Sequence, residues 1–130
     1  MQTHFTSEND LSAAVKHWLD KLNEIGVIST LHFHVPNEFK PHKNFQAAWA
    51  KKKKVGCLGG APDWVIVWSG GTLLLELKHA KTMKAALKKM RDNQKEVARE
   101  CDEKGINYFI VYDYETFKAA LEKVGLIHLS

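Results

Sequence analysis

The stretch that decides the fold reads DWVIVWSGGTLLLELK and covers residues 63–78. Its two halves are rich in apolar and β-branched residues, and the tripeptide SGG separates them at 69–71. A glycine pair between two such runs is typical of a β-hairpin, because primed turns need positive φ at their central residues. The stretch therefore predicts two antiparallel strands joined by a tight turn.

The expected turn also predicts which side chains share a face of the hairpin. A turn centred on residues 70–71 pairs Val65 with Glu76 across the two strands. The same register pairs Asp63 with Lys78. Side chains alternate between the two faces of a strand, so Asp63, Glu76 and Lys78 are expected on one side.

Two carboxylates and a lysine on one strand face suggest a chemical role. Neighbouring carboxylates repel each other unless a cation lies between them, and Mg²⁺ is bound by one or two carboxylates together with waters and phosphate. Lys78 can position or deprotonate an attacking water, or stabilise charge on a phosphate. The alternative is that Glu76 and Lys78 are ordinary edge-strand charges that oppose aggregation. These residues alone leave both interpretations open.

Hydrophobic periodicity predicts the elements around the hairpin. They are a helix from about Leu11 to Ile25 with Ser7 at its start and Gly26 at its end, a strand at Val27–Val35, one long helical stripe from Met83 to Cys101 that stops at Gly105, a strand at Ile106–Tyr112, and a helix from Tyr114 to Val124. The order α-β-β-β-α-β-α predicts an α/β fold with a mixed sheet flanked by helices. The length of 130 residues predicts a single domain over 1–130.

Composition excludes several other classes of protein. The net charge of +4 and the pI near 9.0 are compatible with a polyanionic partner without requiring one. Cys57 and Cys101 are far apart, which favours reduced thiols in a cytoplasmic setting. No signal peptide and no apolar run of about 20 residues is present, so no membrane association is expected. The seven histidines have no zinc-finger spacing and are interpreted as structural or surface residues.

Pro62-Asp63, followed after twelve residues by Glu76-Leu77-Lys78, resembles the P-D…(D/E)-x-K signature of the restriction-endonuclease-like nucleases. Further ordered features resemble one branch of that superfamily, the virus-type replication–repair nuclease (VRR-NUC) domain in its stand-alone phage or bacterial form. These features are Glu8, Pro36-Asn37-Glu38, the run from Gly56 through Gly59-Gly60-Ala61-Pro62 to Asp63, Gln94, and the strand Ile106–Tyr112 after Gly105. The resemblance runs from about residue 8 to residue 112 and implies the restriction-endonuclease-like core.

The resemblance implies a role for each matching residue. Asp63, Glu76 and the backbone carbonyl of Leu77 would bind Mg²⁺ or Mn²⁺, and Lys78 would be the catalytic lysine. Glu8 would complete the acidic cluster, and Gln94 would lie near the metal and the substrate. The bland alternatives are that Glu8 simply suits a helix N-terminus and that Gln94 belongs to a solvated helix face.

Basic residues near these positions are candidate DNA contacts. The run Lys51-Lys52-Lys53-Lys54 precedes the glycine loop, Lys81 follows the second hairpin strand, and Asn37 belongs to the resembling motif. Contacts from such residues go to phosphates and carry no base specificity. The alternative is a solvated charge run that serves solubility. Lys84, Lys88, Lys89 and Arg91 leave the same choice open for the following helix.

The expected function is therefore metal-dependent, structure-selective DNA hydrolysis in a bacterial or phage-infected cytoplasm. Stand-alone members of the resembling family imply a homodimer similar to a Holliday-junction resolvase, which acts on branched DNA. Two rivals stand beside this expectation. One is a non-catalytic DNA-binding module of the same fold, and the other is a restriction-type endonuclease that reads a specific sequence.

Overall fold

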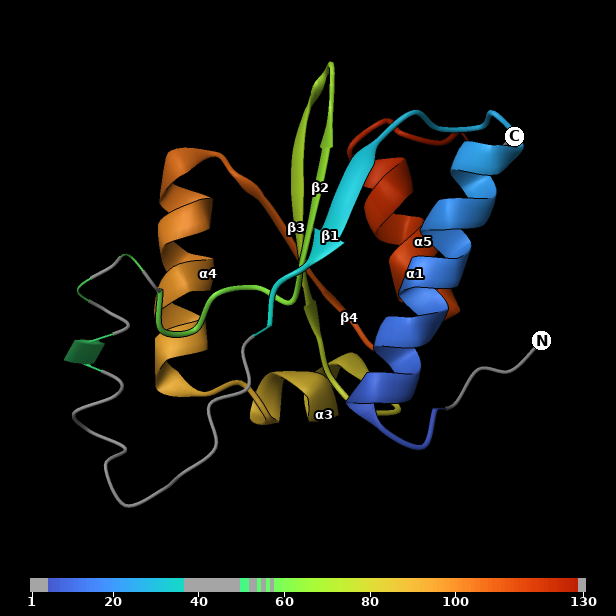
Figure 1. Cartoon of the computed structure of the whole chain (residues 1–130). Coiled ribbons are helices and arrows are strands. Elements are labelled where there is room, and N and C mark those ends of the chain that lie inside the picture. The colour runs from blue at the N-terminus through green and yellow to red at the C-terminus, as the bar shows by residue number, and fades with distance from the viewer. Residues whose placement is uncertain (1–4, 37–49, 52–53, 55, 57, 129–130) are drawn as a thin grey trace.

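The computed structural model describes residues 5–36, 50–51, 54, 56 and 58–128. Asn37, Lys52 and Lys53 lie outside the described residues, as do Glu38 and Cys57. The helices and strands are, in chain order, α1 (Glu8–Glu24), β1 (Leu31–His34), β2 (Trp64–Trp68), β3 (Gly71–Leu77), α3 (Met83–Lys88), α4 (Asp92–Lys104), β4 (Asn107–Val111) and α5 (Tyr114–Lys123). Figure 1 shows their arrangement.

The described strands form one mixed sheet with the order β1-β2-β3-β4. The pairs β1–β2 and β2–β3 are antiparallel, whereas β3 and β4 are parallel and are connected through α3 and α4. A parallel pair needs a long crossover of this kind, because the chain must return to the same end of the sheet. The predicted α/β class with a mixed sheet and flanking helices is confirmed.

The hairpin exists, but its predicted register is wrong by two residues. Trp68 pairs with Gly71 and Trp64 with Leu75, so the turn is centred on Ser69-Gly70 rather than on Gly70-Gly71. Neither glycine has positive φ. The predicted register assumed a primed turn, which needs positive φ at both glycines and does not form here. The Trp68 indole packs over the turn, and a Cβ on Gly70 would stand 2.8 Å from its Nε1 atom. The glycines make room for this ring instead of providing a left-handed turn.

The single long helix predicted after β3 is also wrong, because the chain breaks between α3 and α4. Lys89 ends α3 as its C-cap, and Arg91 is extended with ψ 161°. The Arg91 N–H donates to Oε1 of the Gln94 side chain at 2.9 Å. A glutamine at the third helical position that accepts this bond satisfies a backbone donor that a new helix start would otherwise leave unpaired.

The two faces of the sheet are covered differently. Helices α1 and α5 lie on one face and α4 lies on the other, as the edge-on view of the sheet shows (Figure 1). The main core lies between the sheet and the α1–α5 pair and includes these buried residues: Leu11, Val15, Leu19, Ile66, Leu73, Leu75, Leu77, Val111, Phe117 and Leu121. Their alternation along β3 turns Leu73, Leu75 and Leu77 toward this core, so Glu76 points to the α4 face.

The predicted helix caps are confirmed at both ends of α1 and at the end of α4. The Ser7 side chain accepts from the Asp10 N–H at 3.1 Å, and Gly26 follows the helix with φ 80°. Gly105 ends α4 in the left-handed conformation. The first strand is shorter than predicted. In the described part of the chain, no helix has the length and apolar character needed to cross a membrane.

Candidate active site

Glu76 and Lys78 lie where β3 ends, on the face of the sheet that α4 covers. Both side chains are buried, with 1% and 6% of the residue surface exposed. The Lys78 N–H donates to the Val111 carbonyl at 3.0 Å, so pairing with β4 continues to this residue. The Lys78 Nζ atom is 3.5 Å from Oε2 of Glu76. The two side chains are therefore held together in a region that excludes most water.

Asp63, the residue that precedes β2, also belongs to this cluster. Its N–H donates to the Leu75 carbonyl at 2.9 Å, and its carbonyl accepts from the Val35 N–H at 2.7 Å. The corrected register continues one step beyond Trp64–Leu75 and sets Asp63 beside Glu76 rather than beside Lys78. Because the shift is two residues, the predicted sharing of one face survives the correction. The Leu77 N–H donates to Oδ2 of Asp63 at 2.8 Å and fixes the carboxylate at the strand end.

The glycine loop that leads into Asp63 packs closely on the start of α4. Gly60 has φ 78°, and a Cβ at this position would lie 2.5 Å from the carbonyl carbon of Asn93. Only glycine combines this left-handed conformation with so close an approach to another backbone. The loop thus holds Asp63 and the first turn of α4 in one fixed relation.

Gln94 connects the lysine and the glutamate from α4. Its Oε1 accepts from Lys78 Nζ at 2.9 Å, and its Nε2 donates to Glu76 Oε2 at 3.1 Å. The ammonium only donates, so it must face the amide oxygen, and the amide nitrogen is then left for the carboxylate. The residue is 4% exposed, so the alternative of a solvated helix face is wrong. Gln94 both starts α4 and orients the two charged groups.

The surroundings of the Glu76 carboxyl group disfavour its ionised form. Burial, followed by the neighbouring Asp63 carboxylate, raises the pKa of Glu76 to about 8, and Lys78 opposes both influences. Its second oxygen, Oε1, is buried and has no hydrogen-bond partner among the described residues. A buried acceptor without a partner costs free energy, and structures usually provide a partner for it.

The chemistry of this donor set fits a hard divalent cation. Two neighbouring carboxylates, one with an unsatisfied buried oxygen, match the ligand type that Mg²⁺ and Mn²⁺ prefer. Within the ranges that the structure describes, no three His, Cys, Asp or Glu side chains are placed together to hold a metal ion. The chain thus offers two carboxylates, Asp63 and Glu76, and further ligands would come from the Leu77 carbonyl, water or substrate.

Glu8 is not brought into this cluster in the described part of the chain. It is the exposed first residue of α1, the helix that covers the opposite face of the sheet. Ser12, one turn later, accepts from the Trp64 indole N–H at 3.0 Å, so this end of α1 lies at the start of β2. Glu8 therefore approaches the end of the sheet that carries Asp63, without a direct contact to it.

The basic candidates lie on the surface. Lys51 and Lys54 are exposed, and Lys81 is exposed between β3 and α3. Further exposed basic residues lie on α3, on the start of α4 and between them: Lys84, Lys88, Lys89, Arg91 and Lys95. Lys89 donates to the carbonyl of His79, the residue after Lys78. Among these basic residues, Lys89 therefore contacts the backbone next to the buried cluster.

Tyr108 on β4 is a neighbour of the cluster that sequence reasoning missed. It pairs with Leu74, so it lies diagonally from Glu76 on the same face of the sheet. Its hydroxyl is buried and, within the described residues, has no hydrogen-bond partner. Burial and the nearby Glu76 charge raise the pKa of this phenol. The alternation of strand β4 was a usable signal, but it needed the parallel register with β3.

Comparisons with models of protein families, with curated proteins and with solved structures found no match to this chain. The site is therefore interpreted from its own geometry and from the sequence resemblance.

Proposed function

We propose that this protein is a metal-dependent nuclease that hydrolyses DNA phosphodiester bonds at the Asp63–Glu76–Lys78 cluster. The observation that carries the proposal is the arrangement of these groups, in which Glu76 and Lys78 are buried and Asp63 is half-buried. Lys78 and Glu76 are 3.5 Å apart, Gln94 connects them, and Asp63 stands on the same strand face. Burying ionisable groups is destabilising, and β3 lies between β2 and β4, so an edge-strand role that only opposes aggregation does not account for them.

The side chains suggest a separate catalytic or positioning role for each residue. Asp63 and Glu76 would hold Mg²⁺ or Mn²⁺, with the Leu77 carbonyl as a further ligand. Such an ion, when bound, polarises a phosphoryl oxygen and lowers the pKa of a bound water. Lys78 is the cation that Gln94 Oε1 orients, and it can stabilise negative charge on the phosphate in the transition state. Gln94 is a positioning residue, because it acts through Lys78 and Glu76.

The fold supports a finer proposal within the α/β class. We infer a restriction-endonuclease-like core of the VRR-NUC type, because a hairpin carries the acidic residues and the lysine, and a helix glutamine completes the cluster. The Pro62-Asp63 and Glu76-Leu77-Lys78 motif and Gln94 agree with that inference. Glu8 keeps its implied role as a metal ligand only if substrate or metal draws the start of α1 toward Asp63.

The substrate proposal is branched DNA cut by a homodimer in the cytoplasm. A chain of 130 residues covers few base pairs alone, and two copies supply two active sites for two strands. The edge strand β1 exposes Leu31 and Phe33 with 70% and 48% of their surfaces accessible, a feature that suits burial between subunits. Size-exclusion chromatography with light scattering tests the dimer independently of activity.

The decisive experiment compares the wild type with Lys78→Ala, Asp63→Asn and Glu76→Gln on branched, flapped and linear DNA. Each substitution is expected to lower the cleavage rate by about a hundred-fold or more. Reactions with Mg²⁺, Mn²⁺ and EDTA test the metal requirement. Lys21→Ala and Asp102→Asn are the matched controls, since both residues are exposed on helices away from the cluster.

Thermal unfolding of each variant separates lost chemistry from lost folding. Cleavage that persists in the folded Lys78→Ala and Asp63→Asn proteins would overturn the proposal, as would failure of the wild type to cut any of the substrates.

A further inference from the structure

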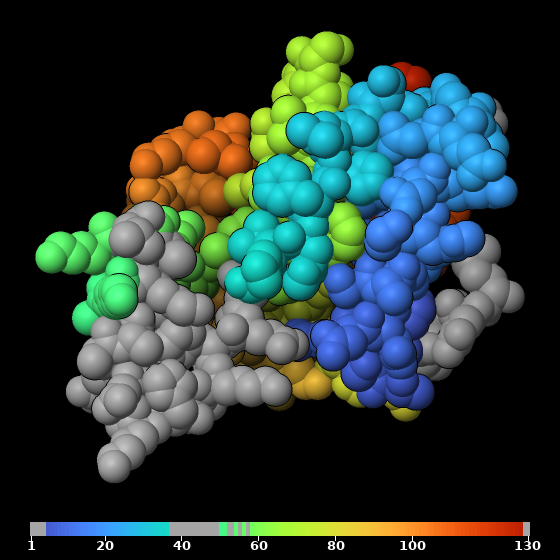
Figure 2. Space-filling model, in the orientation of Figure 1, coloured from blue at the N-terminus to red at the C-terminus, as the bar shows by residue number. Residues whose placement is uncertain are grey.

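A groove of about 480 Å³ runs between α1 and the edge strand β1, away from the buried cluster. Figure 2 views the molecule from this side, with β1 in cyan at the surface beside α1 in blue. Asn9, Ser12 and Lys16 line it from the helix, and His32, His34 and Trp64 line it from the strands. The lining therefore combines aromatic rings with hydrogen-bonding groups.

One wall of the groove is held rigid by its own hydrogen bonds. The Trp64 indole N–H donates to Ser12 Oγ at 3.0 Å. The Nε2 atom of His32 is 2.8 Å from Asp20 Oδ1, and Lys16 Nζ is 2.6 Å from the other oxygen of that carboxylate. The Lys16 ammonium beside Asp20 reduces the repulsion between this carboxylate and an anionic ligand. A wall ordered before binding reduces the entropy cost of binding.

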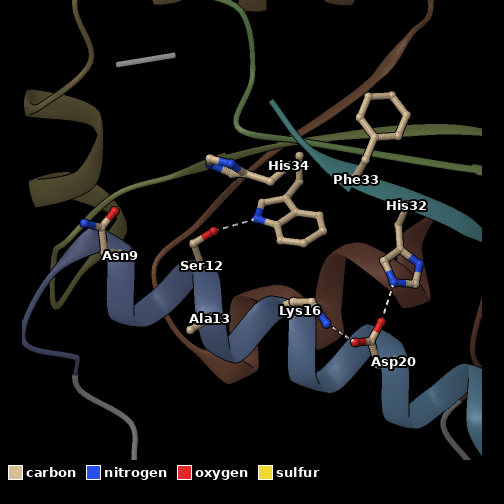
Figure 3. A pocket seen from close by; sticks show the side chains of 9 residues that line it. Asn9, Ser12, Ala13, Lys16, Asp20, His32, Phe33 and His34 are labelled. Atoms are coloured by element: carbon tan, nitrogen blue, oxygen red, sulfur yellow. Dashed lines mark hydrogen bonds and ion pairs between the residues drawn. The ribbon is translucent and has the colours of Figure 1, made fainter. Parts of the chain in front are cut away.

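Two other groups that line the groove are Asn9 and His34. Within the described residues, neither the Asn9 amide nor the His34 ring makes a hydrogen bond to the protein. The His34 ring is exposed and stands 5.8 Å from the Trp64 ring at 60°. Figure 3 shows His34 over the groove while Phe33 points away from α1. An aromatic face and an amide are thus presented together.

We propose that this groove binds an unpaired nucleobase of a single-stranded DNA arm, with the base stacked on His34 and its edge hydrogen-bonded to Asn9. Stacking on aromatic side chains is the general way in which proteins hold single strands, and it tolerates any base. An asparagine amide offers the donor and acceptor pair that matches a base edge. Lys16, whose ammonium pairs with Asp20, also lines the groove.

The position of the groove links it to the buried cluster. Asn9 follows Glu8 at the start of α1, and Trp64 follows Asp63 at the start of β2. Adjacent residues of a strand point to opposite faces, so the groove and the cluster lie on the two sides of one sheet end. This inference rests on the proposed nuclease function and adds to it a preference for substrates with an unpaired strand beside the cut.

The test measures DNA binding without cleavage, using the full-length protein in EDTA at neutral pH. Fluorescence anisotropy follows a labelled oligothymidine and a labelled duplex of the same length. His34→Ala is expected to weaken single-strand binding about five-fold or more, the loss typical of one stacked base. Asn9→Ala is also expected to weaken it, because the base edge loses a hydrogen bond. Duplex affinity is expected to stay unchanged. His17→Ala is the matched control, since His17 is exposed on α1 and does not line the groove.

Photo-cross-linking supplies a second readout that does not depend on substitutions. An oligonucleotide with 5-iodouracil is expected to attach to β1 or to Trp64. Single-strand affinity that is equal in the wild type and His34→Ala, or attachment only to other segments, overturns the proposal. Such a result would also leave the groove open to a peptide that pairs with the backbone of β1, which does not need the His34 ring.

The experiments can overturn the groove proposal and the nuclease proposal independently of each other. If His34→Ala loses single-strand binding while the wild type cuts no DNA, the result supports the groove proposal and contradicts the nuclease function. If the protein cuts DNA while the groove variants bind single strands as the wild type does, the groove proposal falls alone.

Discussion

At the scale of single residues, Glu76 is a buried carboxyl group whose pKa is strongly raised. Its carboxyl is 1% exposed and lies between a second carboxylate and a lysine. The lysine lowers the pKa of Glu76, but burial and Asp63 together outweigh it, and the pKa rises to about 8. A group in this state is protonated in the metal-free protein at neutral pH. A bound cation would favour the charged form instead.

This pKa shift predicts how stability depends on pH without metal. The unfolded chain releases the Glu76 proton near pH 4.5, whereas the folded chain keeps it until about pH 8. Between these values the folded state binds more protons, so its stability falls as the pH rises. Glu76→Gln is expected to remove most of this slope. Urea unfolding in EDTA at several pH values measures it.

Glu100→Gln is the control for that experiment, because Glu100 is exposed on α4. It is expected to leave the slope in place. An equal slope in the wild type and Glu76→Gln would contradict the raised pKa.

At the scale of elements, the position of Asp63 depends on how the glycine loop meets α4. Gly60 packs against the backbone of Asn93, and the next residue of α4, Gln94, reaches Lys78 and Glu76. One helix start therefore sets the approach of the loop and the orientation of the charged groups. A change at Gly60 is expected to disturb both.

Gly60→Ala and Gly105→Ala form a matched pair that tests this dependence. Both glycines have left-handed φ, at 78° and 70°, but of the two only Gly60 has backbone atoms within 4 Å of the place that a Cβ would take. Gly105→Ala is expected to cost about 1–2 kcal/mol from the left-handed conformation alone. Gly60→Ala adds overpacking of about 1–3 kcal/mol. Denaturant midpoints measure the difference, and equal losses would mean that the close approach has no energetic weight.

At the scale of the whole molecule, metal binding and folding are expected to be coupled. A cation that binds only the folded chain at a hundred times its Kd stabilises it by about 2.7 kcal/mol. For a domain of this size that corresponds to a rise in Tm of roughly 10 °C. Because Glu76 must lose a proton to bind the ion, the stabilisation by Mn²⁺ should be larger at pH 8 than at pH 6.

Differential scanning fluorimetry with increasing Mn²⁺ measures this coupling. Asp63→Asn and Glu76→Gln are expected to abolish the rise in Tm, and Glu103→Gln, exposed on α4, should retain it. A rise that is the same in all four proteins would place the metal elsewhere.

Some features followed from the sequence alone because they depend on neighbouring residues. The caps at Ser7 and Gly105 follow from local hydrogen bonding and from the freedom of glycine, and the common face of Asp63, Glu76 and Lys78 follows from strand alternation. The order of strands and helices also followed, apart from the break at Arg91. Periodicity alone did not show that break, since the apolar stripe runs through it.

Other features were decided only by tertiary structure, because they depend on contacts between distant segments. The hairpin register differs from the one that turn propensity predicts, and the Trp68 indole packs on the turn glycines. The buried bridge of Gln94 between Lys78 and Glu76, the raised pKa of Glu76 and the diagonal position of Tyr108 all require α4 and β4 to meet β3. Local sequence determines which face a side chain takes, and only packing determines what that face meets.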